Sequence, residues 1–446
     1  MRIVHLTASS ALGGAERVFL ELLRSTPAGE IEPHLIVPTA GPLVERAEKA
    51  GASVTVLQMP AALLRLGAAS LGQAPVQVRT GARPRSRLGQ GASRIESVAS
   101  ATPAAIHYVA ALRATIERLR PTIVHSHGIK QHLLASLACR GRVPVVWHLH
   151  DFLGERRAIL PLFRVVPAPA AVIAISHAVA ADARERVPGL APIVVHNGID
   201  TAAIHPRSSR RADSTAFDSS EPSWLDRLVN LPPTPSETLR VGLVATFARW
   251  KGHDVFIDAI AELVRAGAHH GVRFYIVGGP LYDTKGSQFS EAELRELARS
   301  RGVDASVGFV PYQVDPWPVY DALDVVVHAS TRTEPFGLTI AEAMACGRPV
   351  ILTQSAGAAE LITEGRDALV IPPGDPSSLA GALIELLGDA NRRDVMGRMA
   401  RERAAERFSR ERMQRGIRAV YLTALERFAA QRAKPSRSLS RSVGLS

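Results

Sequence analysis

Cysteine, aromatic side chains and long apolar runs are all scarce in this chain of 446 residues. Its two cysteines, Cys139 and Cys346, stand far apart in apolar segments, which suits a reducing compartment and excludes a disulfide scaffold or a cysteine-ligated metal cluster. No apolar run reaches the ~20 residues that a membrane-spanning helix requires. The opening residues Met1–His5 resemble a first strand rather than a signal peptide, so we expect a cytoplasmic protein without a membrane span.

The charge is unbalanced, with 53 Lys and Arg against 42 Asp and Glu and a net charge of +11. Part of the excess is local, because Arg65–Arg94 contains six arginines and no acid, and the tail from Arg427 onward is similarly basic. A solvated loop and a frayed terminus would explain both segments. The functional alternative is contact with an anionic membrane surface. Nucleic-acid binding is not expected, since no aromatic residues interleave with either segment.

Hydrophobic residues make up 46% of the chain, which is ordinary for a globular protein, and the length predicts two domains of α/β class. Segments rich in Val and Ile alternate with amphipathic helical patterns, which predicts parallel sheets covered by helices on both faces. The halves at 1–205 and 239–410 are separated by 206–238, where Ser, Pro and Asp cluster as in a linker. The expected strands are Arg2–Thr7, His34–Val37, Ser53–Leu57, Thr122–His125, Val143–Leu149, Ala171–Ile175, Ile193–His196, Arg240–Ala245, Arg273–Val277, Ser306–Val310, Asp324–Ala329, Pro349–Leu352 and Ala368–Ile371.

Two segments fall outside this alternation. Residues 59–102 are poor in both helical and strand periodicity, and we expect a mobile basic insertion there. Residues 411–446 are expected to form a final helix that packs back toward the N-terminal domain, followed by the basic tail. Two open α/β halves leave a cleft at the carboxyl ends of their strands, which is where we look for a site.

The most informative segment runs from Thr331 to Val350. A strand is expected to end near Ala329, a loop then carries Glu334, and a helix starts near Thr339. The turn at Pro335–Gly337 exposes backbone N–H groups at the helix start, which makes an anion site. The spacing Thr339–Glu342 also fits a capping box, in which Glu342 would only satisfy a backbone donor. A glutamate in a loop, such as Glu334, is most often merely solvated.

Residues Glu334–Glu342 and the Ala-Met-Ala-Cys-Gly-Arg-Pro-Val that follows them resemble the Glu-x7-Glu signature of retaining nucleotide-sugar glycosyltransferases of family 4. The resemblance covers roughly 1–205 and 238–410. It implies the GT-B fold, in which two Rossmann-like domains face each other across a cleft, the N-terminal one binding the acceptor and the C-terminal one binding the nucleotide-sugar.

The family's glutamates imply two different roles. Glu342 resembles the one that accepts hydrogen bonds from the ribose hydroxyls, and Glu334 the one that holds the hydroxyls of the transferred sugar. A carboxylate suits both because it accepts two charge-assisted hydrogen bonds at once. The amides of Phe336, Gly337 and Leu338 would face the sugar and the distal phosphate.

A second resemblance concerns Arg240–Asp254, which is similar to the family's strand and loop ending in Lys-Gly. In the family an arginine and this lysine neutralise the diphosphate leaving group, and Lys251 matches the lysine. The family's arginine position holds Ala245-Thr246 here, so Arg249 is the candidate substitute, although a basic pair in a loop is commonly surface decoration. Val310 stands where the family often holds the base by backbone contacts.

In the N-terminal half, the Gly13-Gly14 turn between the first strand and a helix matches the family's loop at the donor phosphates. His150 is predicted to line the acceptor side of the cleft with His127 behind it, and Asp151 to hold the histidine tautomer or touch the acceptor. A metal site is an alternative for these histidines, but we expect their spacing to spread them over both strand faces. Ser176, Asn197–Asp200 and Ser355–Glu360 resemble further landmarks, for which strand-end turns are an equal explanation.

The sequence therefore predicts a retaining hexosyltransferase of cell-surface polysaccharide or glycolipid synthesis, acting by front-face displacement with neither metal nor cofactor. Its expected partners are a nucleotide-sugar donor and a lipid-linked or oligosaccharide acceptor at the inner membrane face. Two alternatives remain open. A nucleotide-sugar epimerase would use the same cleft with acid and base groups, and a non-catalytic binding subunit would keep the fold alone.

Overall fold

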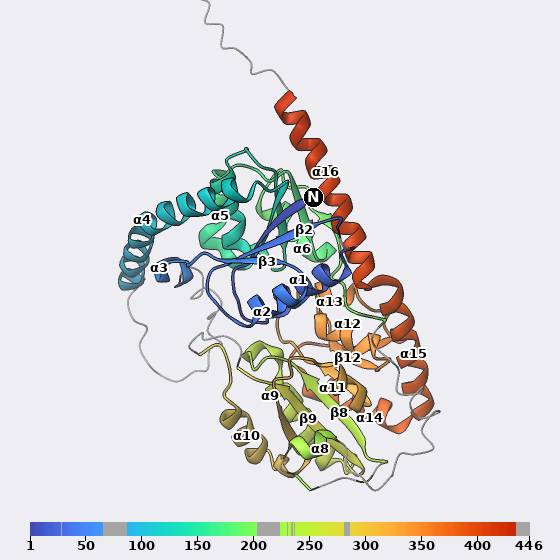
Figure 1. Ribbon diagram of the computed structural model, residues 1–446. Coiled ribbons are helices and arrows are strands. Elements are labelled where there is room, and N and C mark those ends of the chain that lie inside the picture. Colours follow the sequence, from blue (N-terminus) through green and yellow to red (C-terminus); the bar gives the residue numbers. More distant parts are fainter. Residues whose placement is uncertain are drawn as a thin grey trace, which may run out of the picture.

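The computed structural model describes residues 1–65, 87–202, 224–280 and 286–433 apart from residues 28, 230, 233, 234 and 236, and for 65, 87–102, 157 and 158 it describes the backbone alone. The described residues form two open, fully parallel sheets, each flanked by helices (Figure 1). This confirms the predicted α/β class with two facing Rossmann-like units. No helix in these ranges is long and apolar enough to cross a membrane.

The first sheet has the strand order β3-β2-β1-β4-β5-β6-β7. Its strands are β1 Arg2–Leu6, β2 Glu32–Val37, β3 Ser53–Val56, β4 Ile123–His127, β5 Val145–Leu149, β6 Ala171–Ala174 and β7 Ile193–Val194. The helical segments that accompany them are α1 Gly14–Ser25, α2 Pro42–Lys49, α3 Ala61–Arg65, α4 Arg87–Leu119, α5 Ile129–Cys139, η2 Leu153–Arg164 and α6 His177–Arg186. The strand order reverses between β1 and β4, and ligands bind at such switch points in open α/β sheets.

The second sheet has the order β10-β9-β8-β11-β12-β13, and its switch point lies between β8 and β11. Its strands are β8 Leu239–Val244, β9 Val272–Gly278, β10 Val307–Pro311, β11 Val325–His328, β12 Val350–Thr353 and β13 Ala368–Ile371. The helical segments are α8 Trp224–Leu228, η3 Arg249–Lys251, α9 His253–Arg265, α10 Glu291–Ser300, η4 Asp304–Ser306, α11 Trp317–Ala322, α12 Leu338–Ala345, α13 Ala356–Ala359, α14 Pro376–Gly388, α15 Ala390–Arg407 and α16 Arg410–Ala433.

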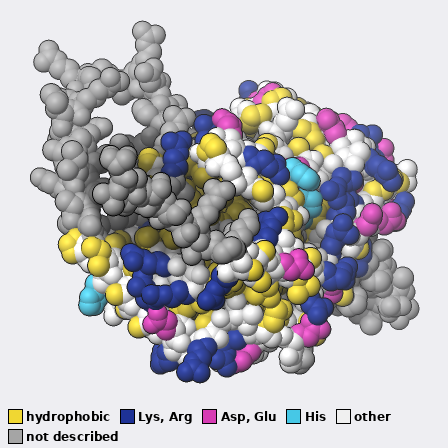
Figure 2. All heavy atoms as spheres, turned by 90° about the horizontal axis from the view of Figure 1, so that it is seen from above, with side chains coloured by type: hydrophobic (Ala, Val, Ile, Leu, Met, Phe, Trp, Pro, Cys, Tyr) yellow, Lys and Arg dark blue, Asp and Glu magenta, His cyan; other side chains and the backbone are white. Residues whose placement is uncertain are grey.

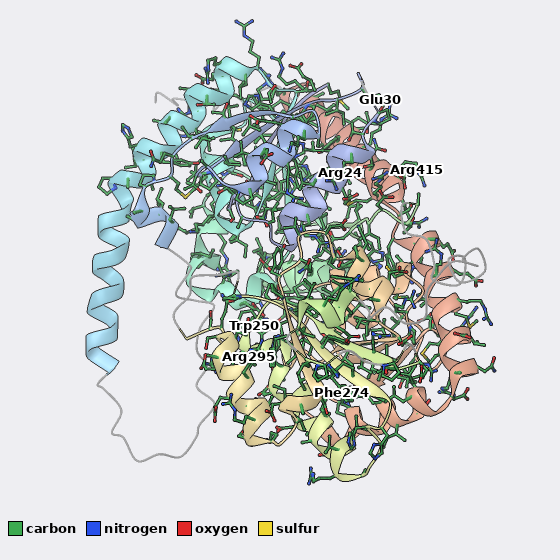
Figure 3. The ribbon with its side chains drawn as sticks, turned by 60° about the horizontal axis from the view of Figure 1, so that its bottom comes forward. Arg24, Glu30, Trp250, Phe274, Arg295 and Arg415 are labelled. Atoms are coloured by element: carbon green, nitrogen blue, oxygen red, sulfur yellow. The ribbon has the colours of Figure 1, made fainter. Side chains whose placement is uncertain are left out.

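Helix α16 leaves the second unit and runs along the first, beside α1 (Figures 1 and 3). Its apolar residues share one core with strands of the first sheet, and Tyr421 and Ile417 are fully buried there. The crossing is held by backbone hydrogen bonds between Ile199 and Phe408 (2.8 Å) and between Arg410 and Ile199 (3.0 Å). The first unit is therefore completed by a segment that follows the second unit in sequence.

Two segments that the sequence left without regular structure are helical where the structure describes them. Residues 87–102 begin α4, and their alanines have high helix propensity. Residues 224–229 of the expected linker pack on the second unit, because Leu225 and Val229 are buried and Asp226 accepts a hydrogen bond from Tyr275. Residues 66–86, 203–223 and the tail from 434 lie outside the described residues.

Basic side chains are spread over the face seen in Figure 2, and acidic side chains lie among them. Several ion pairs of the described residues join exposed neighbours on one helix, such as Lys49 with Glu45 at 2.6 Å and Arg295 with Glu291 at 2.8 Å. Exposed pairs of this kind contribute little to stability.

Candidate active site

A cavity of about 450 Å³ lies between the two units, at the carboxyl ends of both sheets. Both switch points open into it, so that loops after β1, β4, β8 and β11 form its walls. Most of the residues singled out from the sequence line it, namely Gly13, Gly14, His127, His150, Asp151, Lys251, Glu334, Phe336, Gly337 and Leu338. Arg249, Val310 and Glu342 are not among its lining residues.

Glu334 is the most strongly coordinated carboxylate of the cavity. Its Oε2 accepts hydrogen bonds from Lys251 Nζ at 2.6 Å and Ser330 Oγ at 3.3 Å, and lies 3.2 Å from His328 Nε2. Burial alone would raise the pKa of this carboxyl, but Lys251 and His328 outweigh burial and hold the pKa well below its usual range. Glu334 is therefore ionised at any physiological pH and is a fixed acceptor at the cavity wall.

The turn after Glu334 aims the start of α12 at the cavity. Gly337 is the N-cap of α12 and has φ 94°, a conformation that other residues rarely adopt. A Cβ on Gly337 would lie 2.7 Å from Cδ1 of Ile340, so that a larger residue would require this side chain to move as well. The amide of Glu334 donates to Ser355 Oγ at 2.5 Å, which ties the loop to the strand end after β12. The unbonded amides at the helix start thus face the space where an anion would bind.

Glu342 does not form the capping box that its spacing suggested. Gly337, not Thr339, caps α12, and the Glu342 carboxylate accepts hydrogen bonds from Tyr320 Oη at 2.9 Å and from the Arg17 guanidinium of the other unit. The side chain is 1% exposed and borders a smaller cavity beside the main one. Burial raises the pKa of Glu342, and Arg17 offsets only part of that effect.

Lys251 reaches the cavity from η3, whereas Arg249 does not. The predicted substitution of Arg249 for the family's arginine is wrong in this structure, because its guanidinium pairs with Glu293 at 2.6 Å and stacks on Phe289, and its side chain is 43% exposed. Within η3, the side chain of Lys251 faces the cavity and that of Arg249 faces away from it. Trp250 and Arg295, labelled in Figure 3, lie on the second unit to which this loop belongs.

Val310 lies inside β10, where its side chain is 1% exposed and packs in the core. Its predicted backbone contact with the base stays a prediction. Tyr312 and Gln313, just after the strand, line the cavity instead. Tyr312 Oη donates to the carbonyl oxygen of Leu12 at 3.1 Å and so joins the second unit to the Gly13–Gly14 turn of the first.

The turn Gly13–Gly14 begins α1, and Gly13 is its N-cap without a side-chain hydrogen bond. A Cβ on Gly14 would meet no atom within 4 Å, so this position opens onto space rather than onto packed protein. The N-termini of α1 and α12 thus both border the cavity, one from each unit.

The histidines converge, contrary to the expectation that their spacing spreads them over both faces. Residues two apart on a strand share a face, so His125 lies beside His127 (ring centroids 4.3 Å apart) and His148 beside His150 (4.2 Å). The nearest hydrogen-bonding partner of His150 Nε2 is His127 Nδ1, at 3.2 Å. Burial lowers the pKa of His150 to about 4 and that of His5 to about 3, so both rings are neutral near pH 7.

Carboxyl groups line the same side of the cavity as the histidines. Burial raises the pKa of Asp151, with Arg156 opposing that rise, and burial raises the pKa of Glu16 to about 7, with a contribution from the charge of Asp151. Glu155 also has a raised pKa because of burial and the charge of Asp151. Three carboxyl groups with raised pKa values therefore gather on the side of the cavity where His127 and His150 lie.

The landmarks at Ser176 and Glu360 meet at the start of α6. Ser176 caps this helix by accepting a hydrogen bond from the Val179 amide at 3.1 Å, within the first unit. Glu360 of the second unit accepts from the amides of His177 and Ala178, both at 2.8 Å, at the same helix start. Asn197 lines the cavity.

Arg17, Tyr320 and His328 are the site residues that the sequence analysis missed. Arg17 stands one helical turn after the Gly13–Gly14 turn, and His328 ends the strand before Glu334. Both residues lie just outside the motifs, Arg17 one helical turn after one motif and His328 at the end of the strand before another. The contact of Arg17 with Glu342 joins residues 325 apart in sequence, so no local pattern announces it.

The fold and cavity define a two-domain α/β protein of the GT-B class. Residues 12–203 match the family model Glycosyltransferase Family 4, and residues 238–389 match the model Glycosyl transferases group 1. The two matches together span most of the chain. The chain belongs to the family 4 glycosyltransferases with a GT-B fold, as its motifs indicated.

Two curated relatives carry the name D-inositol 3-phosphate glycosyltransferase. The protein from Corynebacterium urealyticum is 34% identical over 37% of this chain and 38% of its own length. The one from Acidothermus cellulolyticus is 33% identical over 56% of this chain and 51% of its own length. The chain thus matches about half or less of the length of these relatives.

Among solved structures, HepE from Anabaena in complex with UDP and glucose has a TM-score of 0.69 to this chain. The two are 22% identical, and the match covers 94% of this chain and 98% of the other. At this identity the likeness concerns the fold alone, and it extends over both units.

Proposed function

We propose that the protein is a retaining hexosyltransferase that moves a sugar from a nucleotide-diphospho-sugar to a hydroxyl acceptor. The observation that carries the proposal is the Lys251–Glu334 pair, which faces the cavity between two helix N-termini. A cation, a fixed carboxylate and the N-termini of two helices are groups that suit a diphospho-sugar. A nucleotide-sugar epimerase would instead require a placed acid and base, whereas Glu334 is locked in its ionised form.

In the proposed complex, Lys251 and the amides at Gly13–Gly14 and Phe336–Leu338 contact the phosphates, and Glu334 accepts hydrogen bonds from the sugar hydroxyls. Glu342 accepts from the ribose hydroxyls. Because Arg17 and Tyr320 now donate to Glu342, the ribose must share or displace these donors. Movement of one unit relative to the other would do so, since Arg17 and Glu342 come from different units.

The transfer is proposed to proceed on one face of the sugar. The bond from the anomeric carbon to the phosphate oxygen breaks, the acceptor oxygen bonds to that carbon from the same side, and the acceptor proton passes to the departing phosphate. Lys251, Arg17 and the helix N-termini supply the positive field that stabilises the leaving diphosphate, so we propose that no metal ion and no cofactor act at this step. Positioning and electrostatics then carry the reaction.

The acceptor is proposed to enter on the side of His127, His150 and Asp151. A lipid-linked or oligosaccharide acceptor of polysaccharide or glycolipid synthesis is our first candidate. The names of the curated relatives favour a second one, a phosphorylated cyclitol.

A lipid-linked acceptor would place the protein at the inner face of the membrane, where the excess of basic residues would contact acidic lipid. Sedimentation with vesicles tests this docking. Binding that does not rise with the fraction of anionic lipid would contradict it.

The donor assignment is tested by a thermal-shift screen against UDP-, GDP- and ADP-sugars, with and without Mg²⁺. UDP-sugars have the best support, since HepE was solved with UDP and with UDP-glucose. We expect one nucleotide to bind independently of Mg²⁺ and to lose binding in Glu342→Ala. Binding of none of them by folded protein would favour the non-catalytic subunit instead.

A further inference from the structure

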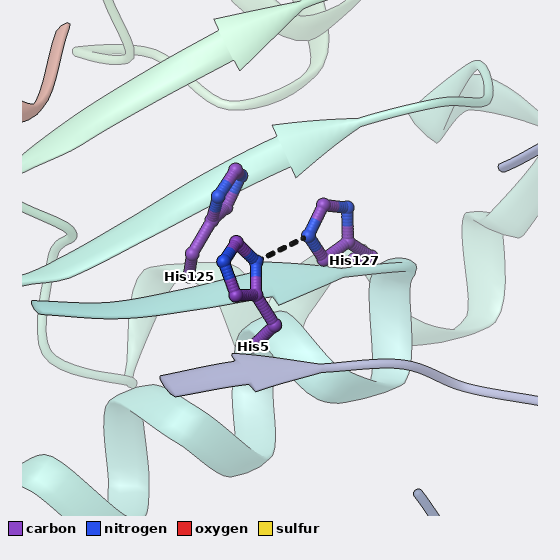
Figure 4. A group of neighbouring side chains, drawn as sticks. All are labelled: His5, His125 and His127. Atoms are coloured by element: carbon purple, nitrogen blue, oxygen red, sulfur yellow. Dashed lines mark hydrogen bonds between the residues drawn. The ribbon is translucent and has the colours of Figure 1, made fainter. Parts of the chain in front are cut away.

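Histidines from three adjacent strands form a cluster behind and beside the acceptor side of the cavity. The parallel register pairs His5 of β1 with His125 of β4, and His127 of β4 with His148 of β5. The two-residue spacing adds His127 and His150 to the same face, and Figure 4 shows three of the five rings, His5, His125 and His127, packed together. The sheet geometry, not a local loop, therefore brings five imidazoles into contact.

Several of these rings are buried with nitrogens that no protein group satisfies. Within the described part of the chain, both ring nitrogens of His148 and Nε2 of His125 have no hydrogen-bond partner. A buried polar atom left without a partner is destabilising and rare in folded proteins. Both nitrogens of His148 are therefore free of partners among the described residues and available to a ligand.

The spacing of the nitrogens fits a metal ion. His127, His148 and His150 each offer one nitrogen, and these atoms all lie within 4.8 Å of one another. Nδ1 of His127 and Nε2 of His150 are 3.2 Å apart. Two nitrogens bound at about 2.0–2.1 Å to a tetrahedral ion would be separated by about 3.3 Å.

The neighbouring hydrogen bonds orient the rings for this purpose. Nε2 of His127 lies 3.2 Å from Nδ1 of His5, drawn as the dashed line in Figure 4, so that His127 can donate there and keep Nδ1 as a ligand. Metal-binding histidines commonly use their second nitrogen in this way. The partner of His125 is Tyr421 of α16, whose hydroxyl lies 2.7 Å from Nδ1.

Access and charge favour this trio over the deeper trio His5, His125 and His127. The favoured trio has two members that line the cavity, His127 and His150, whereas in the deeper trio only the shared His127 does so. Carboxyl groups of Glu16, Asp151 and Glu155 line the same cavity and would balance the charge of a dication. An ion at the deeper trio would lie among neutral rings and apolar side chains.

We propose that His127, His148 and His150 bind one divalent transition-metal ion of the zinc class, with its remaining coordination position open to the cavity. Imidazole ligands suit such ions better than Mg²⁺ or Ca²⁺. The site is separate from the diphosphate contacts at Lys251, and the proposal does not depend on the transfer reaction.

The test measures metal binding by the full chain without a polyhistidine tag. Protein stripped by a chelator is titrated with Co²⁺, and the visible absorption of the bound ion is recorded, while equilibrium dialysis with Zn²⁺ gives the stoichiometry. We expect one ion per chain and a spectrum of low-coordinate nitrogen ligation. His148→Gln and His150→Gln should each weaken binding by about 10-fold or more.

His132→Gln is the matched control, because His132 is a buried histidine of the same unit that belongs to neither trio. It should bind Co²⁺ as the wild type does, and thermal melts show which variants fold. If His148→Gln does not fold, His150→Gln at the cavity edge carries the test. Binding lost in His125→Gln but kept in His148→Gln or His150→Gln would overturn the assignment in favour of the deeper trio. Less than half an ion per wild-type chain, or binding kept in both His148→Gln and His150→Gln, would also overturn it.

Discussion

Two basic side chains in η3, only two residues apart, have opposite surroundings. Lys251 is 21% exposed and pairs with the partly buried Glu334 at the cavity wall, whereas Arg249 is 43% exposed and pairs with the exposed Glu293. Exposed pairs contribute little, but a partly buried charge at a cavity wall acts more strongly on a bound anion. We therefore expect Lys251 to act on the bound donor and Arg249 to have no effect on it.

We expect Lys251→Ala to lower kcat/KM by roughly 10- to 150-fold, which corresponds to the loss of a charge-assisted contact of ~1.5–3 kcal/mol. Arg249→Ala, the matched control from the same segment, should stay within about twofold of the wild type. Steady-state kinetics with the donor identified in the nucleotide screen measures both. Equal losses in the two variants would contradict the placement of the diphosphate at Lys251.

Site residues that belong to a local sequence motif could be predicted from the sequence. Site residues that are brought in by a contact between the two units could not. Gly13, Lys251 and Glu334 sit in local patterns and all reach the cavity. The partner of Glu342 could not be foreseen, because Arg17 lies in the other unit. The histidine error had a different cause: a two-residue spacing puts both rings on one strand face, so convergence was readable but was misjudged.

Among the elements, strands were easier to predict than helices. Each of the thirteen expected strands overlaps an observed one, because short Val- and Ile-rich runs between turns have few other structures open to them. Helix α5 was not predicted, since nearly all of its residues are buried and it lacks a polar face. The helical start of α4 was missed because its alanine-rich sequence carries no amphipathic period.

The turn between η3 and α9 shows how tightly an element end can be specified. Gly252 has φ 74°, and a Cβ there would lie 1.9 Å from the carbonyl oxygen of Ala329. Gly267, after α9, has φ 70° but nothing within 4 Å of its added Cβ. We expect Gly267→Ala to lower the free energy of unfolding by about 1–2 kcal/mol through backbone strain.

Gly252→Ala should lower the free energy of unfolding by about 1–3 kcal/mol more than Gly267→Ala does, because the backbone must also shift. Urea unfolding of both variants measures the difference. Equal destabilisation of the two variants would show that the backbone at Gly252 moves away from Ala329 at no cost in free energy.

The whole molecule is held together by carboxylates that meet donors of the other unit. Glu342 accepts from Arg17, and Glu360 accepts from the start of α6. Beneath these contacts the first unit buries a set of neutral histidines. Lowering the pH is therefore expected to affect stability in two ways: by protonating the buried histidines and by protonating the carboxylates that link the two units.

We expect stability to fall as the pH is lowered below about 6.5, the ordinary pKa of histidine. Burial lowers the folded-state pKa to about 3 for His5, His132 and His253 and to about 4 for His150. The unfolded chain then binds more protons than the folded one between about pH 6.5 and 4, and each of these rings removes up to ~1.4 kcal/mol per pH unit.

Glu16, with a pKa raised to about 7, acts in the opposite sense, and the raised pKa values of Asp151, Glu155 and Glu342 add to its effect. The histidines with lowered pKa values are expected to outweigh these carboxyl groups. Urea unfolding at pH 7 and pH 5, in the presence of a chelator, measures the change. Stability that stays constant or rises on acidification would show that these rings are accessible to protons in the folded state.

Helix α16 has a consequence for biosynthesis. The core of the first unit includes Ile3, Val18 and Val146, yet Ile417 and Tyr421 complete it from beyond the second unit. Domains made first on the ribosome usually fold first, but here the first unit leaves the exit tunnel with that apolar face uncovered. The nascent chain must therefore carry an open apolar patch until α16 has been synthesised, which is after the whole second unit.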